Sequence, residues 1–127
     1  MVNVIKVSPL INNSNPLPDG SVQSPASVAT VAAAGTTQAT GTVLSAPFNL
    51  ISNNTASNGV VLPVASGIKQ TFTIYPQLAT NAPKVYPPVG GTINSGTVNA
   101  SVASTAQKAI DYIAVDSTGL NYITLGL

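Results

Sequence analysis

The chain has 127 residues, the usual size of one domain, but only 6% of them are charged, against roughly 25% in typical soluble domains. Intrinsic disorder is excluded for most of the chain, since disordered segments combine low hydrophobicity with high net charge and 44% of these residues are hydrophobic. A net charge of +1 excludes binding to nucleic acid through a dense basic patch.

The residue types also leave little catalytic chemistry. The charged set is four lysines and three aspartates, and the chain contains neither histidine nor cysteine. A general base near neutral pH is usually His or a tuned carboxylate or lysine, and a nucleophile needs such a base beside it. Zinc, haem and iron–sulfur sites need Cys or His ligands. We therefore expect no enzyme, and we assign no catalytic, cofactor-binding or metal residue and no small-molecule substrate.

Membrane insertion is not expected either. No stretch approaches the roughly 20 consecutive apolar residues of a spanning helix. The first ten residues contain one lysine, Lys6, and an apolar run interrupted by Pro9, which does not match a secretory signal.

The first 35 residues differ from the rest of the chain. Four prolines fall among Asn, Ser, Asp and Gly residues, and this density of breakers rules out a long helix and interrupts any strand. We expect residues 1–35 to form an extended N-terminal arm and residues 36–127 to form one domain. The arm either reaches a neighbouring subunit or is a loose terminus.

From Thr36 onward, short runs rich in β-forming residues alternate with turn residues every eight to twelve positions, which is typical of a sandwich or barrel. The expected strands are residues 40–44, 48–52, 59–62, 69–75, 84–86, 91–93, 97–102, 109–115 and 121–125. The sequence therefore predicts an all-β fold: a small β-sandwich or a jelly-roll-like barrel.

Residues 104–114 allow a second interpretation. Ser104 and Gln107 have the spacing of a capping box, and Ala106, Ile110 and Ile113 recur at helical intervals. The run Ile, Tyr, Ile, Val nevertheless favours a strand at 109–115. We prefer the strand, and the helix stays open.

Strict alternation in Thr71–Tyr75 places Phe72 and Ile74 on one face of a strand, and we expect that face to be buried. The full predicted core consists of apolar residues within the expected strands: Phe48, Leu50, Val61, Phe72, Ile74, Val85, Ile93, Ile110 and Tyr112.

Three motifs occur in a fixed order. Residues 35–40 read GTTQAT, residues 58–63 read NGVVLP and residues 84–94 read KVYPPVGGTIN. This order and spacing resemble a module of tailed-bacteriophage virion structural proteins, over about residues 35–125. The closing strand of that family often carries Trp, whereas residues 119–127 here contain only Tyr122 as an aromatic residue.

The resemblance implies a capsid decoration (cement) protein that binds the major capsid protein on the outside of the assembled shell, commonly as a homotrimer. Such a protein would be located in the virion, at the capsid surface, after assembly in the bacterial cytoplasm. The alternative is a head fibre or a tail fibre/adsorption module that binds the host surface. We expect no nucleic-acid or membrane partner. The expected capsid contacts are the apolar residues of the arm: Val2, Val4, Ile5, Val7, Leu10, Ile11 and Leu17.

Overall fold

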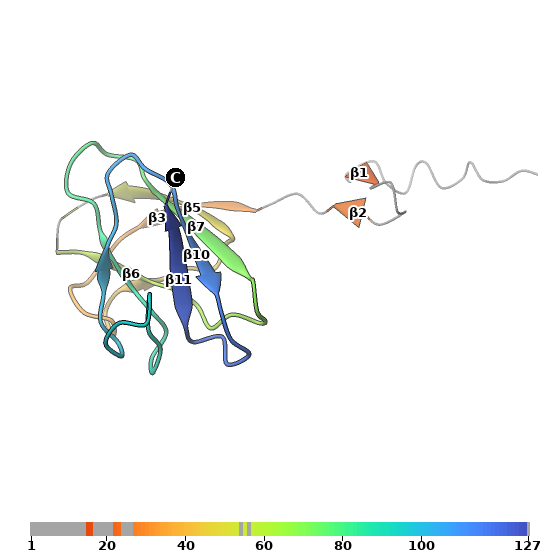
Figure 1. Cartoon of the computed structure of the whole chain (residues 1–127). Coiled ribbons are helices and arrows are strands. Elements are labelled where there is room, and N and C mark those ends of the chain that lie inside the picture. Colours follow the sequence, from red (N-terminus) through yellow and green to blue (C-terminus); the bar gives the residue numbers. More distant parts are fainter. Residues whose placement is uncertain (1–14, 17–21, 24–26, 54, 56, 127) are drawn as a thin grey trace, which may run out of the picture.

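The computed structural model describes residues 15–16, 22–23, 27–53, 55 and 57–126. The described residues form strands and no helix, which confirms the all-β prediction, and no helix capable of crossing a membrane occurs among them (Figure 1). The strands are β1 (Asn15–Pro16), β2 (Val22–Gln23), β3 (Val28–Ala32), β4 (Thr42–Val43), β5 (Phe48–Asn53), β6 (Gly59–Val61), β7 (Thr71–Pro76), β8 (Lys84–Tyr86), β9 (Val102–Ala103), β10 (Ile110–Ala114) and β11 (Tyr122–Gly126).

Two mixed sheets make up the domain. The large sheet has the order β11-β10-β7-β5-β3, and the small sheet has the order β4-β6-β8-β9. In the large sheet β7, β10 and β11 are antiparallel, whereas β3, β5 and β7 are parallel. In the small sheet β4, β6 and β8 are parallel, and β9 is antiparallel to β8. Strands β1 and β2 pair with each other outside both sheets.

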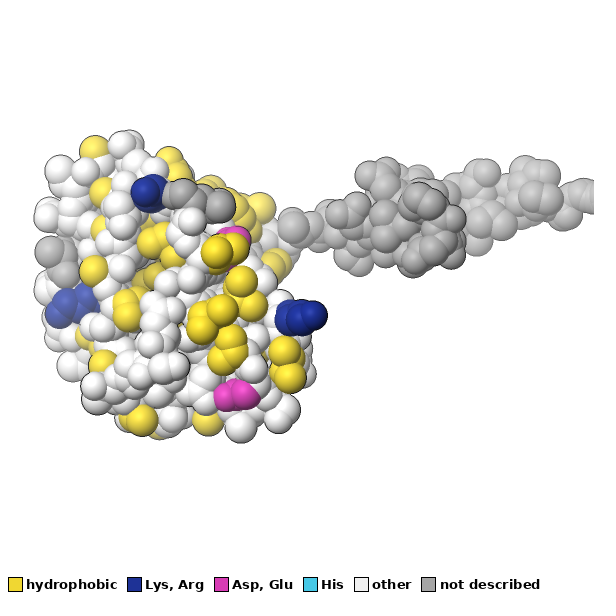
Figure 2. All heavy atoms as spheres, viewed as in Figure 1, with side chains coloured by type: hydrophobic (Ala, Val, Ile, Leu, Met, Phe, Trp, Pro, Cys, Tyr) yellow, Lys and Arg dark blue, Asp and Glu magenta, His cyan; other side chains and the backbone are white. Residues whose placement is uncertain are grey.

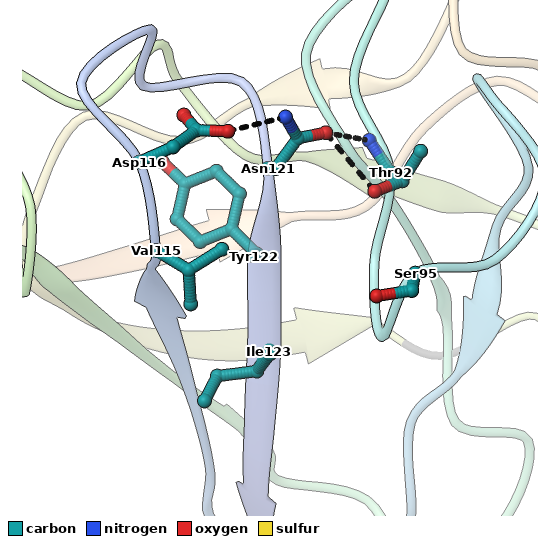
Figure 3. Close-up of a pocket in the computed structure, with 7 residues that line it drawn as sticks. All are labelled: Thr92, Ser95, Val115, Asp116, Asn121, Tyr122 and Ile123. Carbon is teal, nitrogen blue, oxygen red and sulfur yellow. Dashed lines mark hydrogen bonds between the residues drawn. The ribbon is translucent and has the colours of Figure 1, made fainter.

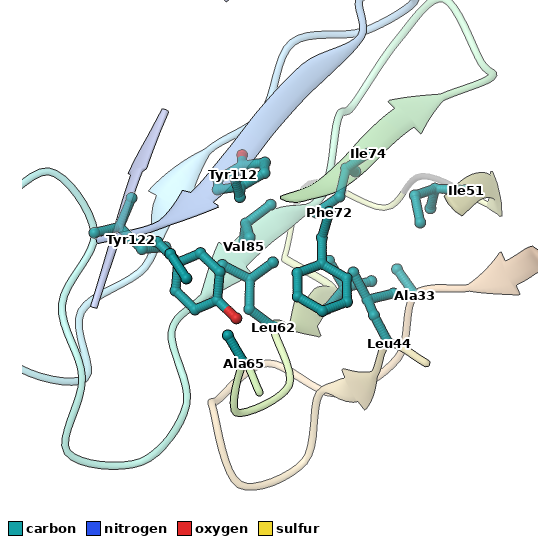
Figure 4. Packing of buried hydrophobic residues seen from close by; sticks show 13 residues of the cluster. Ala33, Leu44, Ile51, Leu62, Ala65, Phe72, Ile74, Val85, Tyr112 and Tyr122 are labelled. Atoms are coloured by element: carbon teal, nitrogen blue, oxygen red, sulfur yellow. The ribbon is translucent and has the colours of Figure 1, made fainter. Parts of the chain in front are cut away.

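The hydrophobic core lies between the two sheets (Figure 4). Ile74 and Tyr112 reach it from the large sheet, and Val60 and Val85 reach it from the small sheet. The rings of Phe72 and Tyr122 meet edge to face with centroids 6.2 Å apart. Burial of this apolar surface, at about 25 cal/mol per Å², is the main force that holds the sheets together.

Most of the expected core residues lie in this layer. Those buried in the layer are Phe72, Ile74, Val85, Ile93 and Tyr112. Val61 was also expected in the core, but its side chain is buried on the opposite side of the small sheet, because it pairs with Tyr86 and not with Val85. Ile110 is half-buried and packs against the cluster.

The prediction for β5 was wrong, because Phe48 and Leu50 are only half-buried, and Asn49 and Ile51 face the core instead. Pairing with β7 explains the reversal: Asn49 is the partner of Ile74, whose side chain is buried, so Asn49 points to the same side. The side-chain nitrogen of Asn49 donates a hydrogen bond to the Ala46 carbonyl oxygen at 2.7 Å, so the nitrogen of this buried amide has a partner.

Two expected strands are largely absent. At residues 91–93 only Ile93 is paired, through an isolated bridge to Tyr122. Residues 97–99 form a turn, and β9 begins only at Val102. Positive φ angles at Asn94, Ser95 and Asn99 bend this segment away from an extended conformation. Residues 110–114 form β10 and not a helix, so the preferred interpretation of that segment is confirmed.

The large sheet also begins earlier than expected. Strand β3, at residues 28–32, lies within the range assigned to the arm, yet it pairs along its length with β5. The boundary expected after Gly35 therefore does not coincide with the start of the sheet. The Ala- and Val-rich sequence of this strand has no alternation of polar and apolar residues, so its pairing partner was not visible from the sequence.

The three sequence motifs meet on the outer side of the small sheet. The Tyr86 hydroxyl donates to the Thr36 carbonyl oxygen at 2.9 Å, and the Gln38 amide donates to the Pro87 carbonyl oxygen at 2.6 Å. Gly59 lies under the Tyr86 ring, so closely that an added Cβ would be 2.6 Å from the ring. The loop of residues 36–41 therefore covers the small sheet, and Tyr86 is buried beneath it.

This close approach makes Gly59 a sensitive position. We expect Gly59→Ala to lower the free energy of unfolding by about 1–3 kcal/mol, the usual cost of forcing an extra group into a packed site. Gly67→Ala is the matched control, because an added Cβ there meets no atom within 4 Å and φ is not positive. Urea denaturation measures both, and an equal effect of the two substitutions would contradict the role of the Gly59–Tyr86 contact.

Two buried tyrosines differ in their hydrogen bonding. The Tyr122 hydroxyl donates to the Pro63 carbonyl oxygen at 2.7 Å, whereas the Tyr112 hydroxyl has no partner among the described residues. Burial raises the pKa of both, that of Tyr122 to about 12, so both hydroxyls stay neutral at ordinary pH.

Removal of the Tyr112 hydroxyl and removal of the Tyr122 hydroxyl should therefore change the free energy of unfolding in opposite directions. Tyr112→Phe deletes an unsatisfied buried group and should raise the free energy of unfolding by about 1 kcal/mol, whereas Tyr122→Phe should lower it by about 1 kcal/mol. Chemical denaturation of the two variants under the same conditions measures the difference. A loss of stability in Tyr112→Phe would show that its hydroxyl has a partner after all.

Candidate assembly surface

The described residues offer no chemical site of the usual kinds. They contain no group of three or more His, Cys, Asp or Glu side chains that could hold a metal ion. The functional candidate is instead a surface, and the pairing register of the large sheet locates it.

Paired residues of neighbouring strands point to the same side of a sheet. Phe72 and Tyr112 are partners and both are buried, so the residues next to them in sequence point away from the core. Phe48, Thr73, Asp111 and Leu125 accordingly form one row across four strands on the side away from the core. Thr71, Ile113 and Ile123 form a second row.

We call this side of the large sheet the outer face. Its apolar residues are Val28, Phe48, Leu50, Tyr75, Ile113, Ile123 and Leu125. The exposed fractions of Ile123 and Leu125 are 42% and 54%. Figure 2 shows hydrophobic side chains gathered over β10 and β11 on this side of the molecule. Exposed apolar side chains that gather on one face of a sheet are typical of a site of interaction.

The two sheets differ in this respect. Loop 36–41 covers the small sheet from outside, and both Val61 and Tyr86 are buried there. On the large sheet, Val28, Ile123 and Leu125 are exposed. On the outer side of the small sheet, Val43 at the sheet edge is exposed as well, so the outer face of the large sheet is the one that carries the larger group of exposed apolar side chains.

One charged side chain, Asp111, lies in the rows of the outer face. The Thr73 hydroxyl, in the same row, donates to its Oδ1 atom at 2.6 Å. This bond occupies one of the two carboxylate oxygens, so the other can still accept a donor or pair with a cation. The rows of the outer face thus carry one negative charge, with Thr73 on one side of it and Leu125 on the other.

A hollow of about 410 Å³ lies at one end of the outer face (Figure 3). It is lined by Thr92, Ser95, Val115, Asp116, Asn121, Tyr122 and Ile123. Asn121 connects its two sides: its amide nitrogen donates to Asp116 Oδ2, and its oxygen accepts the Thr92 backbone N–H at 3.0 Å. The Tyr122 ring belongs to the core, so the hollow exposes no aromatic ring of its lining residues.

Asp116 is held by the turn that joins β10 and β11. The Thr118 hydroxyl donates to Oδ1 at 2.6 Å and the Thr118 backbone N–H donates at 3.1 Å. These hydrogen bonds, that from the Thr118 side chain first and that from Asn121 second, lower the pKa of Asp116 below 3.8. The carboxylate is therefore a structural acceptor of this turn.

The arm residues expected to contact the capsid lie outside the described residues: Val2, Val4, Ile5, Val7, Leu10, Ile11 and Leu17. Sequence reasoning missed the outer face itself, including Ile113, Ile123 and Leu125. A partial signal was present, because Ile113 and the following Val115 are apolar on the face of the strand opposite to Tyr112 and Ala114, but Asp111 interrupts that apolar face.

No family model, curated protein or solved structure matches this chain. The functional assignment therefore depends on the geometry of the surface and on the motifs of the sequence.

The hydrogen bonds to Asp116 predict a dependence of stability on pH. A carboxylate with a lowered pKa in the folded state stabilises the fold above its ordinary pKa of 3.8, and this contribution is lost as the pH falls through the lowered value. We expect the stability of the wild type to decline more steeply below pH 4 than that of Asp116→Asn. Thermal unfolding between pH 2 and 7 tests this, and parallel profiles would contradict it.

Proposed function

We propose that the protein is a decoration (cement) protein of a tailed-bacteriophage capsid. In this proposal a homotrimer of small β-sandwich domains binds the outside of the assembled shell, with the major capsid protein as its partner, and stabilises the shell by bridging capsid subunits. The protein would be assembled in the bacterial cytoplasm and remain on the capsid surface.

The observation that carries the proposal is the apolar outer face with its single charge. A protein that exposes such a surface functions by association, and its low overall charge gives little electrostatic repulsion between closely packed copies. Exposed Ser, Thr and Asn side chains can meet a flat neighbour through hydrogen bonds without the desolvation penalty of ions.

The spatial arrangement of the three motifs supports the resemblance to virion proteins. Thr36, Gln38, Gly59, Tyr86 and Pro87 come from separate motifs, and they contact one another on the small sheet. The motifs therefore form one structural unit. A set of residues that must fit together is more specific to one fold than three independent short matches.

The mechanism is thermodynamic linkage. A ligand that binds only the intact shell stabilises it by RT ln(1 + [L]/Kd), in which L is the decoration protein. No chemical step is needed. The contact would depend on apolar burial and on hydrogen bonds, because exposed ion pairs contribute only about 0–1 kcal/mol each.

The alternative function is a fibre or adsorption module that binds the host surface. The hollow beside Asp116 and Asn121 is the one feature that favours it, since carboxylate and amide groups can hydrogen-bond to sugar hydroxyls. However, Asp116 and Asn121 already bond to each other, and the Tyr122 ring is buried, so no ring is available there to stack on a sugar. Copy number separates the two: that of a decoration protein scales with the number of capsid subunits.

The test compares virions with and without the bound protein during heating. We expect genome release at a lower temperature when the protein is absent. The difference should persist at about 1 M salt, where the Debye length is only about 3 Å and exposed ion pairs are screened. An unchanged release temperature without the protein would exclude a cement function.

A truncated variant tests the contribution of the arm in the same assay. Deletion of residues 1–26 keeps all of β3, whereas deletion of 1–30 would remove the start of that strand. We expect the 27–127 protein to fold and to bind the shell much more weakly. Undiminished binding would assign the shell contact to the folded domain.

A further inference from the structure

The loop of residues 63–70, which leads into β7, exposes further apolar side chains. The exposed fractions of Val64 and Ile68 in this loop are 60% and 57%, and Lys69 beside them is exposed. The loop combines exposed apolar side chains with one positive charge, whereas the outer face combines them with one negative charge. The 63–70 loop and the outer face are therefore both partly apolar and are complementary in charge.

The 63–70 loop is held firmly in place. The backbone N–H of Ala65 donates to the Gly119 carbonyl oxygen at 2.9 Å, and that of Lys69 donates to the Ala114 carbonyl oxygen at 2.8 Å. Inside the loop, the Ser66 N–H donates to Gln70 Oε1 at 2.6 Å. These bonds anchor the loop at the end of β10 while Val64 and Ile68 remain exposed. A loop that is already ordered loses little entropy when it binds.

The size of the outer face argues against a simple face-to-face dimer. Five strands about 4.8 Å apart and about five residues long, at about 3.3 Å per residue, give a projected area of about 400 Å². This projected area, which leaves out the relief of the side chains, is smaller than the roughly 800 Å² of accessible surface that each partner buries in a standard interface. In a closed ring each copy would bury its outer face against one neighbour and its 63–70 loop against the other, so more surface would be buried per copy than in a face-to-face dimer.

The charge of Asp111 also disfavours a face-to-face dimer. Two outer faces packed against each other would bring two Asp111 carboxylates into one apolar interface, where like charges are strongly unfavourable. If the outer face instead meets the 63–70 loop of another copy, Asp111 lies near Lys69. The contact is then between different patches, and such heterologous contacts close into rings when the rotation between copies permits.

We propose that the outer face is the docking site for the 63–70 loop of a second copy, so that each copy of the homotrimer offers its outer face to one neighbour and its loop to the other. Val64 and Ile68 pack on the apolar rows of the neighbour, and Lys69 pairs with its Asp111. This inference rests on the homotrimer of the proposed function, but it does not depend on the contact with the shell.

The first experiment measures the oligomeric state of the full chain in solution by sedimentation velocity. Ile123→Asn changes the outer face and Ile68→Asn changes the loop, and both side chains are exposed, so the fold should tolerate either. Each variant should weaken the trimer at least about tenfold, the effect of losing one important contact residue. Val89→Asn is the matched control, since Val89 is 75% exposed and belongs to neither patch. Circular dichroism verifies that all three remain folded.

The second experiment identifies which patches meet. Because the chain contains no cysteine, Asp111→Cys and Lys69→Cys each introduce a unique thiol. A short bismaleimide should cross-link a mixture of the two variants into dimers and leave each variant alone without cross-links.

Cross-links in Asp111→Cys alone would show a face-to-face contact and overturn the proposal. A monomeric wild type, or a trimer that neither Ile68→Asn nor Ile123→Asn weakens, would equally overturn it. Since no shell is present in either experiment, these outcomes are independent of whether the protein stabilises capsids.

Discussion

The register of β7 against its two neighbours determines the arrangement of the whole large sheet. β7 pairs directly with β5 and with β10, and its residues Phe72 and Ile74 are buried. Because side chains alternate along a strand, this one choice directs Asn49 and Tyr112 inward and sends Phe48, Asp111 and Ile113 outward. Both the core and the outer face follow from it. A slip of one residue in either pairing would exchange the two faces of the slipped strand.

The two sheets differ in how far the face that points away from the core is covered. Part of the small sheet is covered by its own chain: loop 36–41 lies against Val61 and Tyr86, and the absence of a side chain at Gly59 lets the Tyr86 ring come close to the backbone. The large sheet has Val28, Ile123 and Leu125 exposed on its outer face. This asymmetry separates the parts of the sequence that maintain the fold from those that we assign to association. The three sequence motifs belong to the first group, and the residues of the outer face to the second.

A surface of this kind is consistent with the composition. With few ionisable groups, the chain has little means of forming specific salt bridges, and specificity has to come from shape, hydrogen bonds and the placement of the few charges. Asp111 on the outer face and Lys69 on the 63–70 loop have opposite signs. In a nearly uncharged interface, one such pair can determine which patch meets which. In these proposals the trimer contact involves the outer face and the 63–70 loop, whereas the shell contact involves the N-terminal arm.

The amino-acid sequence by itself determined the fold class, most of the strands and most of the core. The alternation of Thr71–Tyr75 placed Phe72 and Ile74 in the core, and β-forming residues favoured a strand over a helix at 110–114, because these signals are local to one strand. Only the tertiary structure decided the side of β5 that is buried, the inclusion of β3 in the large sheet and the location of the outer face. These features depend on which strands are neighbours, and parallel pairing between distant segments such as β3, β5 and β7 has no local signal. Asn49 shows the reason most clearly: a polar residue is buried in place of Phe48 because its position is set by Ile74 of the neighbouring strand and its amide finds the Ala46 carbonyl.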